Sequence, residues 1–219
     1  MKTVSPQPVL MGPREYAGMT EHVCMATGQI TPRYIMTDAA FAREHKARRT
    51  ALLSIQRLRR IELGPHCIFI FESYYTMLFQ IQKMLLTEDC GAQPLAEAFA
   101  AFTPLIPQGR ELLATVMFVT RDDAGHAALP PDLGGVEGRF FLKIGEARIS
   151  GERQEAVPPG REAGTTSSER RIRFTFSDAQ AEQFRAGKAA AMIGCDHPAY
   201  RHLAVISPDS RMELARDLA

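Results

Sequence analysis

The stretch Arg171-Ile172-Arg173-Phe174-Thr175-Phe176 carries the clearest structural pattern in the chain. Its polar and apolar residues alternate, so an extended backbone would place the apolar side chains on one face and the polar ones on the other. This period of two is typical of an antiparallel strand with one buried and one solvated face. The stretch therefore predicts a sheet built on antiparallel strands.

Segments of similar strand character lie on both sides of this stretch, and helical patterns separate several of them. Strands are predicted at 67–71, 112–120, 139–144, 147–152, 189–194 and 202–206. Helices are predicted at 38–60, 74–88, 94–102 and 178–187, with a terminal helix after Ser207-Pro208. These elements predict an α+β fold, mainly an antiparallel sheet, with an N-terminal helical segment and helices between strands.

The length of 219 residues and the hydrophobic fraction of 45% suit one domain with one substantial core. We expect this single α+β domain to span residues 30–219. Residues 1–29 contain several prolines and lack the apolar core of a signal peptide, which indicates an irregular N-terminal extension. The polar, proline-broken stretch near 150–168 predicts a mobile loop.

The overall charge favours no class of charged partner. The 26 basic and 25 acidic residues nearly cancel, so no field of the whole molecule favours a nucleic acid or an acidic membrane. The four cysteines form no Cys-x-x-Cys pair and are interpreted as reduced thiols.

Because no apolar run reaches about eighteen residues, no membrane span is predicted. We expect a cytoplasmic protein.

The predicted helix 38–60 is the one strongly basic element of the chain. Its acidic residues are only Asp38 and Glu44, whereas its basic residues are Arg43, Lys46, Arg48, Arg49, Arg57, Arg59 and Arg60. Such a surface can grip a phosphate backbone, but no helix-turn-helix partner and no interleaved aromatic residues accompany it. We interpret it as a solvated face or a protein docking surface, so nucleic acid is not favoured as a partner.

Two carboxylates, Glu72 and Glu111, border apolar strands, where an ionised group is costly unless it is paired. Arg59 or Arg60 is the expected partner of such a group. The pattern leaves both a structural ion pair and a catalytic acid or base open. No nucleophile motif and no phosphate loop is recognised, so whether the protein is an enzyme also stays open.

Several soft and borderline metal ligands occur in two short segments, and zinc or iron can use such groups. They are His66, Cys67, Cys195, His197 and His202. Their spacing matches no established metal motif, and a cysteine that ends an apolar strand is commonly a buried, inert thiol. We therefore favour no metal and no other cofactor.

A set of short motifs spread over the chain resembles one known family. The motifs are Ile30-Thr31-Pro32, Arg59-Arg60, Gly64-Pro65, Phe71-Glu72, Thr76, Gln80-Ile81-Gln82, Met84, Leu105-Ile106-Pro107, Glu111-Leu112, Ala114-Thr115, the strand Arg171 to Phe176, His197-Pro198 and Tyr200. In this combination the chain resembles the bacterial family named domain of unknown function 3501, over about residues 30–218. Ser73 and Lys83 depart from the family pattern, which has asparagine and glutamate there.

The family has no established activity, but its genes often lie beside those of rubrerythrin-like proteins and iron–sulfur oxidoreductases. The resemblance therefore implies an accessory protein in redox or peroxide metabolism that docks on an iron–sulfur oxidoreductase or a rubrerythrin-like protein. The alternative is an enzyme or binding protein for a small anionic ligand. The side chains expected to form its pocket are Arg59, Arg60, Glu72, Gln80, Gln82, Glu111, His197 and Tyr200.

Overall fold

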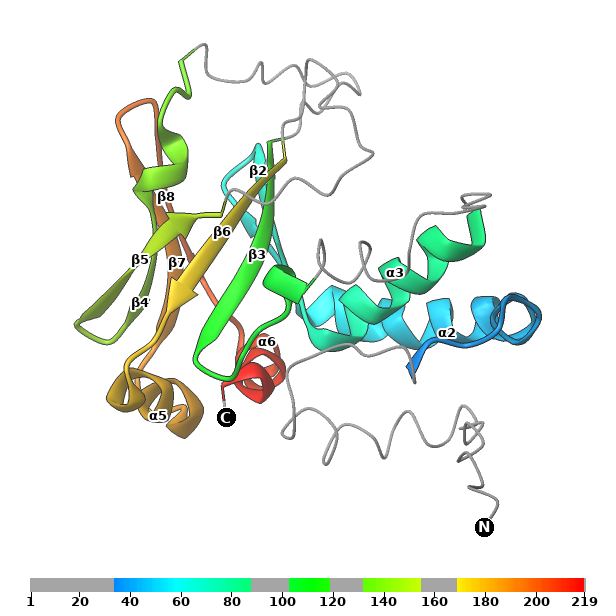
Figure 1. Ribbon diagram of the computed structural model, residues 1–219. Helices are drawn as coiled ribbons and strands as arrows, with labels where there is room; N and C mark the ends of the chain where they lie inside the picture. Colours follow the sequence, from blue (N-terminus) through cyan, green and yellow to red (C-terminus); the bar gives the residue numbers. More distant parts are fainter. Residues whose placement is uncertain (1–33, 88–102, 119–131, 155–168, 219) are drawn as a thin grey trace.

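The computed structural model describes residues 34–87, 103–118, 132–154 and 169–218 (Figure 1). These residues form a single eight-stranded sheet, four α-helices and short 3-10 helices. The helices are α2 (Asp38–Leu58), α3 (Tyr74–Thr87), α5 (Asp178–Ala186) and α6 (Pro208–Leu214). The strands are β1 (Arg60–Leu63), β2 (Cys67–Phe71), β3 (Glu111–Phe118), β4 (Phe140–Ile144), β5 (Ala147–Arg153), β6 (Glu169–Thr175), β7 (Ala191–His197) and β8 (Tyr200–Val205).

The strands follow the spatial order β1-β2-β3-β6-β5-β4-β7-β8, and every neighbouring pair is antiparallel. Strand β6 enters between β3 and β5, and β7 then pairs with the free side of β4. The sheet curves until its two edge strands, β1 and β8, lie beside each other. The predicted α+β class with a mainly antiparallel sheet is confirmed in these broad terms.

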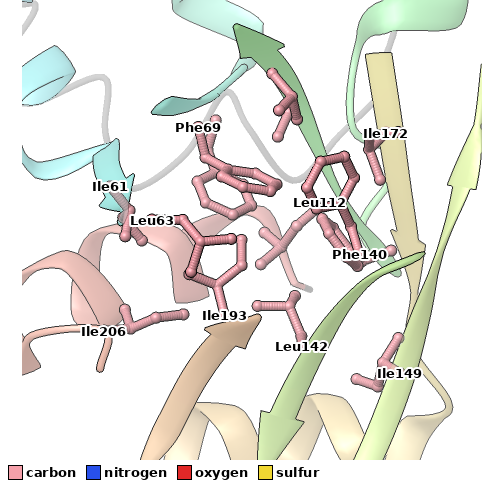
Figure 2. Packing of buried hydrophobic residues seen from close by; sticks show 14 of the residues in the cluster. Ile61, Leu63, Phe69, Leu112, Phe140, Leu142, Ile149, Ile172, Ile193 and Ile206 are labelled. Carbon is pink, nitrogen blue, oxygen red and sulfur yellow. The ribbon is translucent and has the colours of Figure 1, made fainter. Parts of the chain in front are cut away.

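The main hydrophobic core lies inside the curved sheet. Inward-facing side chains from β1, β2, β3, β4, β6 and β7 meet there, as Figure 2 shows for Leu63, Phe69, Leu112, Phe140 and Ile193. Each of these side chains is at most 1% exposed. The alternation predicted for residues 171–176 is also present, because Ile172 and Phe174 face this core while Arg171 and Arg173 are only partly buried.

A second, smaller core lies outside the sheet, under the helices. It joins Leu52 of α2, Met77 and Ile81 of α3, Ile106, and Leu113 of β3. Strand β3 is consequently buried on both faces, which explains its nearly continuous apolar sequence. Figure 1 shows α2 and α3 side by side, extending away from the sheet, while α5 and α6 lie at one end of it.

Most of the predicted elements agree with the structure within a few residues. The exception is the chain after α2: the helix was expected to reach residue 60, but it ends at Leu58, and Arg60 begins the unpredicted strand β1. The predicted loop near 150–168 starts too early, because β5 runs to Arg153, whereas β6 begins at Glu169, directly after the predicted end of the loop. The N-terminal extension 1–29, the helix at 94–102 and the rest of that loop lie outside the described residues.

None of the helices that the structure describes combines the length and the apolar character needed to cross a membrane.

Candidate functional site

Arg59 lies at the centre of the polar interior of the protein and is 1% exposed. Its Nε donates to the carbonyl oxygen of Phe71 at 3.0 Å, and its Nη2 donates to that of Glu72 at 2.8 Å. The same guanidinium binds the carboxylates of Glu213, at 3.2 Å, and Asp217. One side chain therefore joins the end of α2, the end of β2 and the C-terminal segment.

The pKa values of Arg59 and Asp217 are shifted by burial and by the charges close to them. Burial by itself lowers the pKa of Arg59, but the adjacent carboxylates of Asp217 and Glu213 outweigh it and raise this pKa. Burial raises the pKa of Asp217 to about 6, against the opposing attraction of Arg59. Because the guanidinium already binds two carboxylates and two carbonyls, it is poorly placed to receive an additional anion.

Glu72 follows β2 and is buried, 6% exposed. Its two carboxylate oxygens accept hydrogen bonds from Thr115 Oγ1 at 2.8 Å and from Thr76 Oγ1 at 2.9 Å. Burial raises the pKa of Glu72, while the two threonine hydroxyls and the positive charges of Arg59 and Arg171 oppose the rise. A carboxyl group with a raised pKa can transfer protons, but here both of its oxygens are already hydrogen-bonded within the protein.

The expected side-chain ion pair between Glu72 and Arg59 or Arg60 is not the arrangement found. Arg59 reaches the backbone of Glu72 rather than its carboxylate, and Arg60 is exposed and pairs with Glu62 at 3.1 Å. Glu111, the second predicted carboxylate, pairs with Arg173 of β6 at 3.2 Å. Arg173 lies 62 positions from Glu111 in the sequence, so local spacing could not identify this partner.

The two glutamines predicted for the pocket lie in different surroundings. Gln80 is exposed on α3. Gln82 is buried, and its side-chain amide makes two hydrogen bonds to the backbone of Met36, which lies just before α2. Gln82 therefore fastens the chain before α2 onto α3.

Tyr200 and His197 lie at the β7–β8 hairpin. The Tyr200 hydroxyl donates to the carbonyl oxygen of Leu63 at 2.5 Å and accepts from the backbone N–H groups of His66 and Cys67, both at 3.1 Å. His197 Nε2 is hydrogen-bonded to the carbonyl oxygen of Gly134 at 3.1 Å. The structure thus joins Arg59 and Glu72 through a backbone contact, whereas Gln80 is exposed and the other five pocket candidates are held in separate hydrogen bonds. As ligand-binding residues, all eight remain predictions.

The residues considered as metal ligands are mostly buried near Tyr200. The rings of Tyr200 and His202 are 4.3 Å apart, and burial raises the pKa of both thiols, Cys67 and Cys195. Within the part of the chain that the structure describes, no group of three or more His, Cys, Asp or Glu side chains is arranged to hold a metal ion.

The solvent side of α2 carries more exposed cations than any other single element that the structure describes. Arg43, Lys46, Arg49 and Arg57 are exposed there, and we call them the basic face of α2. Arg48, by contrast, is partly buried and pairs with Glu44 at 2.8 Å. The sequence predicted this basic helix, and the structure places its other side against α3 and α6.

Some important residues of the polar interior were not anticipated. Glu213 and Asp217 are four positions apart in the C-terminal segment, and Arg211 donates to three backbone carbonyls, those of Gln183, Phe184 and Ala189. The spacing of the two carboxylates was the only local signal, and it also fits a solvated helix face.

Comparisons with known proteins agree with the resemblance seen in the sequence. A crystal structure of a protein of unknown function from Burkholderia pseudomallei is similar to this chain, with 30% sequence identity and a TM-score of 0.75. The match covers 87% of this chain and 100% of that chain. No curated protein matches. Residues 29–218 match the family described as protein of unknown function (DUF3501). This chain therefore belongs to the DUF3501 family.

Proposed function

We propose that this protein is a non-catalytic accessory protein that docks on a redox enzyme through the basic face of α2. The main support for this proposal is the positive charge of that face. Its four cations make no ion pair with a carboxylate among the described residues, whereas the buried Arg59 already binds two carboxylates. Unpaired cations on one rigid element attract a complementary acidic surface and orient it as it approaches.

We propose an iron–sulfur oxidoreductase or a rubrerythrin-like protein as the partner. The support is the position of the family's genes beside genes for such proteins, together with the basic face. The small-anion alternative receives less support, because all of its candidate side chains except the exposed Gln80 are occupied in hydrogen bonds or ion pairs within the protein.

Affinity purification of the tagged full-length chain, with and without oxygen, tests the proposal. The double variant Lys46→Glu/Arg49→Glu reverses two charges of the basic face. The matched control Lys188→Glu/Arg201→Glu reverses two exposed cations that have no ion-pair partner among the described residues and lie outside α2. The wild type and the control should recover the same iron-containing protein. Recovery with the α2 variant should fall at least about tenfold, because two attractive contacts become repulsive.

Repeated recovery of the protein alone under both conditions would contradict the proposal. Equal recovery by both double variants would show that docking, if it occurs, does not use α2.

A further inference from the structure

Leu53 is exposed in the middle of the solvent side of α2. It is 44% exposed, although Phe41 and Leu52 on the same helix are at most 2% exposed. A single exposed leucine is ordinary on a protein surface. Leu53 lies among the cations of the basic face, and this position helps to distinguish between classes of docking partner.

Lys46, Arg49, Leu53 and Arg57 follow one another at intervals of three or four positions, which places them along one side of the helix. Leu53 therefore has an arginine one turn before it and another one turn after it. The neighbouring exposed residues Thr50 and Ser54 are small, and their hydroxyls donate to carbonyls of the helix itself, both at 2.9 Å.

This order of side chains distinguishes between classes of acidic partner. A phosphate backbone or an anionic membrane surface presents negative charge, but neither sets an apolar group at a fixed place between two charges. A protein helix does so readily, because its side chains repeat with the same period as those of α2. The small side chains beside Leu53 let a second helix approach closely.

We infer that the partner presents an amphipathic acidic helix to α2. In this helix an apolar side chain rests on Leu53, and carboxylates one turn before and one turn after it pair with Arg49 and Arg57. The inference rests on the proposed docking function and names the chemistry of its partner.

Binding of a synthetic peptide to the full-length protein tests the inference. The probe is a labelled helical peptide with one central leucine and a glutamate one turn away on each side, and its matched form carries serine in place of the leucine. Fluorescence anisotropy measures binding to the wild type, to Leu53→Ser, to Lys46→Glu/Arg49→Glu and to the control Leu203→Ser, whose leucine is 57% exposed on β8.

The leucine peptide should bind the wild type and the Leu203→Ser control equally. Leu53→Ser should weaken its binding about tenfold, since partial burial of a leucine contributes on the order of 1.4 kcal/mol, a factor of ten in affinity. The serine peptide should bind about tenfold more weakly to the wild type and should lose little more on Leu53→Ser, because the two changes remove the same contact.

Other outcomes separate this inference from the proposed function. If the charge reversal weakens binding and Leu53→Ser does not, docking by charge survives and the amphipathic partner is wrong. If duplex DNA or anionic vesicles bind more tightly than the leucine peptide, and Leu53→Ser leaves their binding unchanged, the partner is a phosphate surface. If neither variant changes any affinity, α2 is not the docking element and both proposals fail.

Discussion

At the scale of single residues, the polar interior depends on a few groups with unusual surroundings. Asp217 is the clearest case, because burial raises its pKa to about 6 from an ordinary value of 3.8. The folded protein therefore holds this proton more tightly than the unfolded chain does. The resulting stabilisation is complete below pH 3.8 and is lost as the pH rises towards 6.

We predict that Asp217→Asn removes this dependence on pH. The free energy of unfolding of the variant, relative to that of the wild type, should increase between about pH 4 and pH 7. The increase should reach about 3 kcal/mol, at about 1.4 kcal/mol for each tenfold change in proton affinity. Urea denaturation of both proteins across this range measures it. Glu72 also has a raised pKa, but it is present in both proteins and cancels in the comparison. A difference that stays constant with pH would contradict the prediction.

At the scale of elements, helix α5 is defined at both ends by side chains. At its start, the Ser177 hydroxyl accepts from the backbone N–H of Gln180, and the Gln180 side chain accepts from the backbone N–H of Ser177. At its end, Arg211 of α6 donates to the carbonyl oxygens of Gln183 and Phe184, which belong to the last turn of the helix, where carbonyls generally need partners from outside it. The first contact is local and visible in the sequence, but the second is not.

We predict that Arg211→Met destabilises the protein by about 2 kcal/mol or more. The change leaves helix-end carbonyls without a donor and removes a positive charge from the negative end of the helix dipole. The adjacent variant Met212→Ser is the control, since Met212 is 66% exposed, and it should change stability by less than about 0.5 kcal/mol. Thermal denaturation measures both. Equal stability of the two variants would show that Arg211 does not cap α5.

At the scale of the whole molecule, the sheet is nearly closed, and a tyrosine links its two edge strands. No backbone pairing joins β1 to β8 among the described residues, but the Tyr200 hydroxyl at the start of β8 binds three backbone groups of the β1–β2 hairpin. Gly64 in this hairpin approaches β8 so closely that an added Cβ would meet the His202 ring at 2.7 Å.

We predict that Tyr200→Phe loosens this closure. The buried backbone N–H groups of His66 and Cys67 and the carbonyl of Leu63 lose the hydroxyl as a hydrogen-bond partner. This loss should lower the free energy of unfolding by at least about 2 kcal/mol. Hydrogen exchange should become faster in β1 and at the start of β2, while the exchange of β4 and β5 follows only the global change in stability. Leu203→Ala, on the exposed side of β8, serves as the control. Unchanged protection of the hairpin in Tyr200→Phe would mean that side-chain packing alone closes the sheet.

The sequence by itself determined most of the elements of this protein. Strand β2, helix α5 with its capping box, and the proline-started helix α6 were all predicted, because periodicity and capping act over only a few residues. The basic character of α2 was equally visible. The burial expected for Glu72 was correct for the same reason, since the glutamate directly follows an apolar strand.

Only the tertiary structure decided how these elements meet. It placed β6 between β3 and β5. It also paired the carboxylate of Glu72 with the hydroxyls of two threonines, and it brought Arg59 into contact with Asp217, which lies 158 positions away in the sequence. Such contacts depend on which surfaces the folded core brings together, and no local spacing records them. The exposed position of Leu53 among the cations of α2 was decided in the same way, because packing of the opposite side of the helix determines which side remains in solvent.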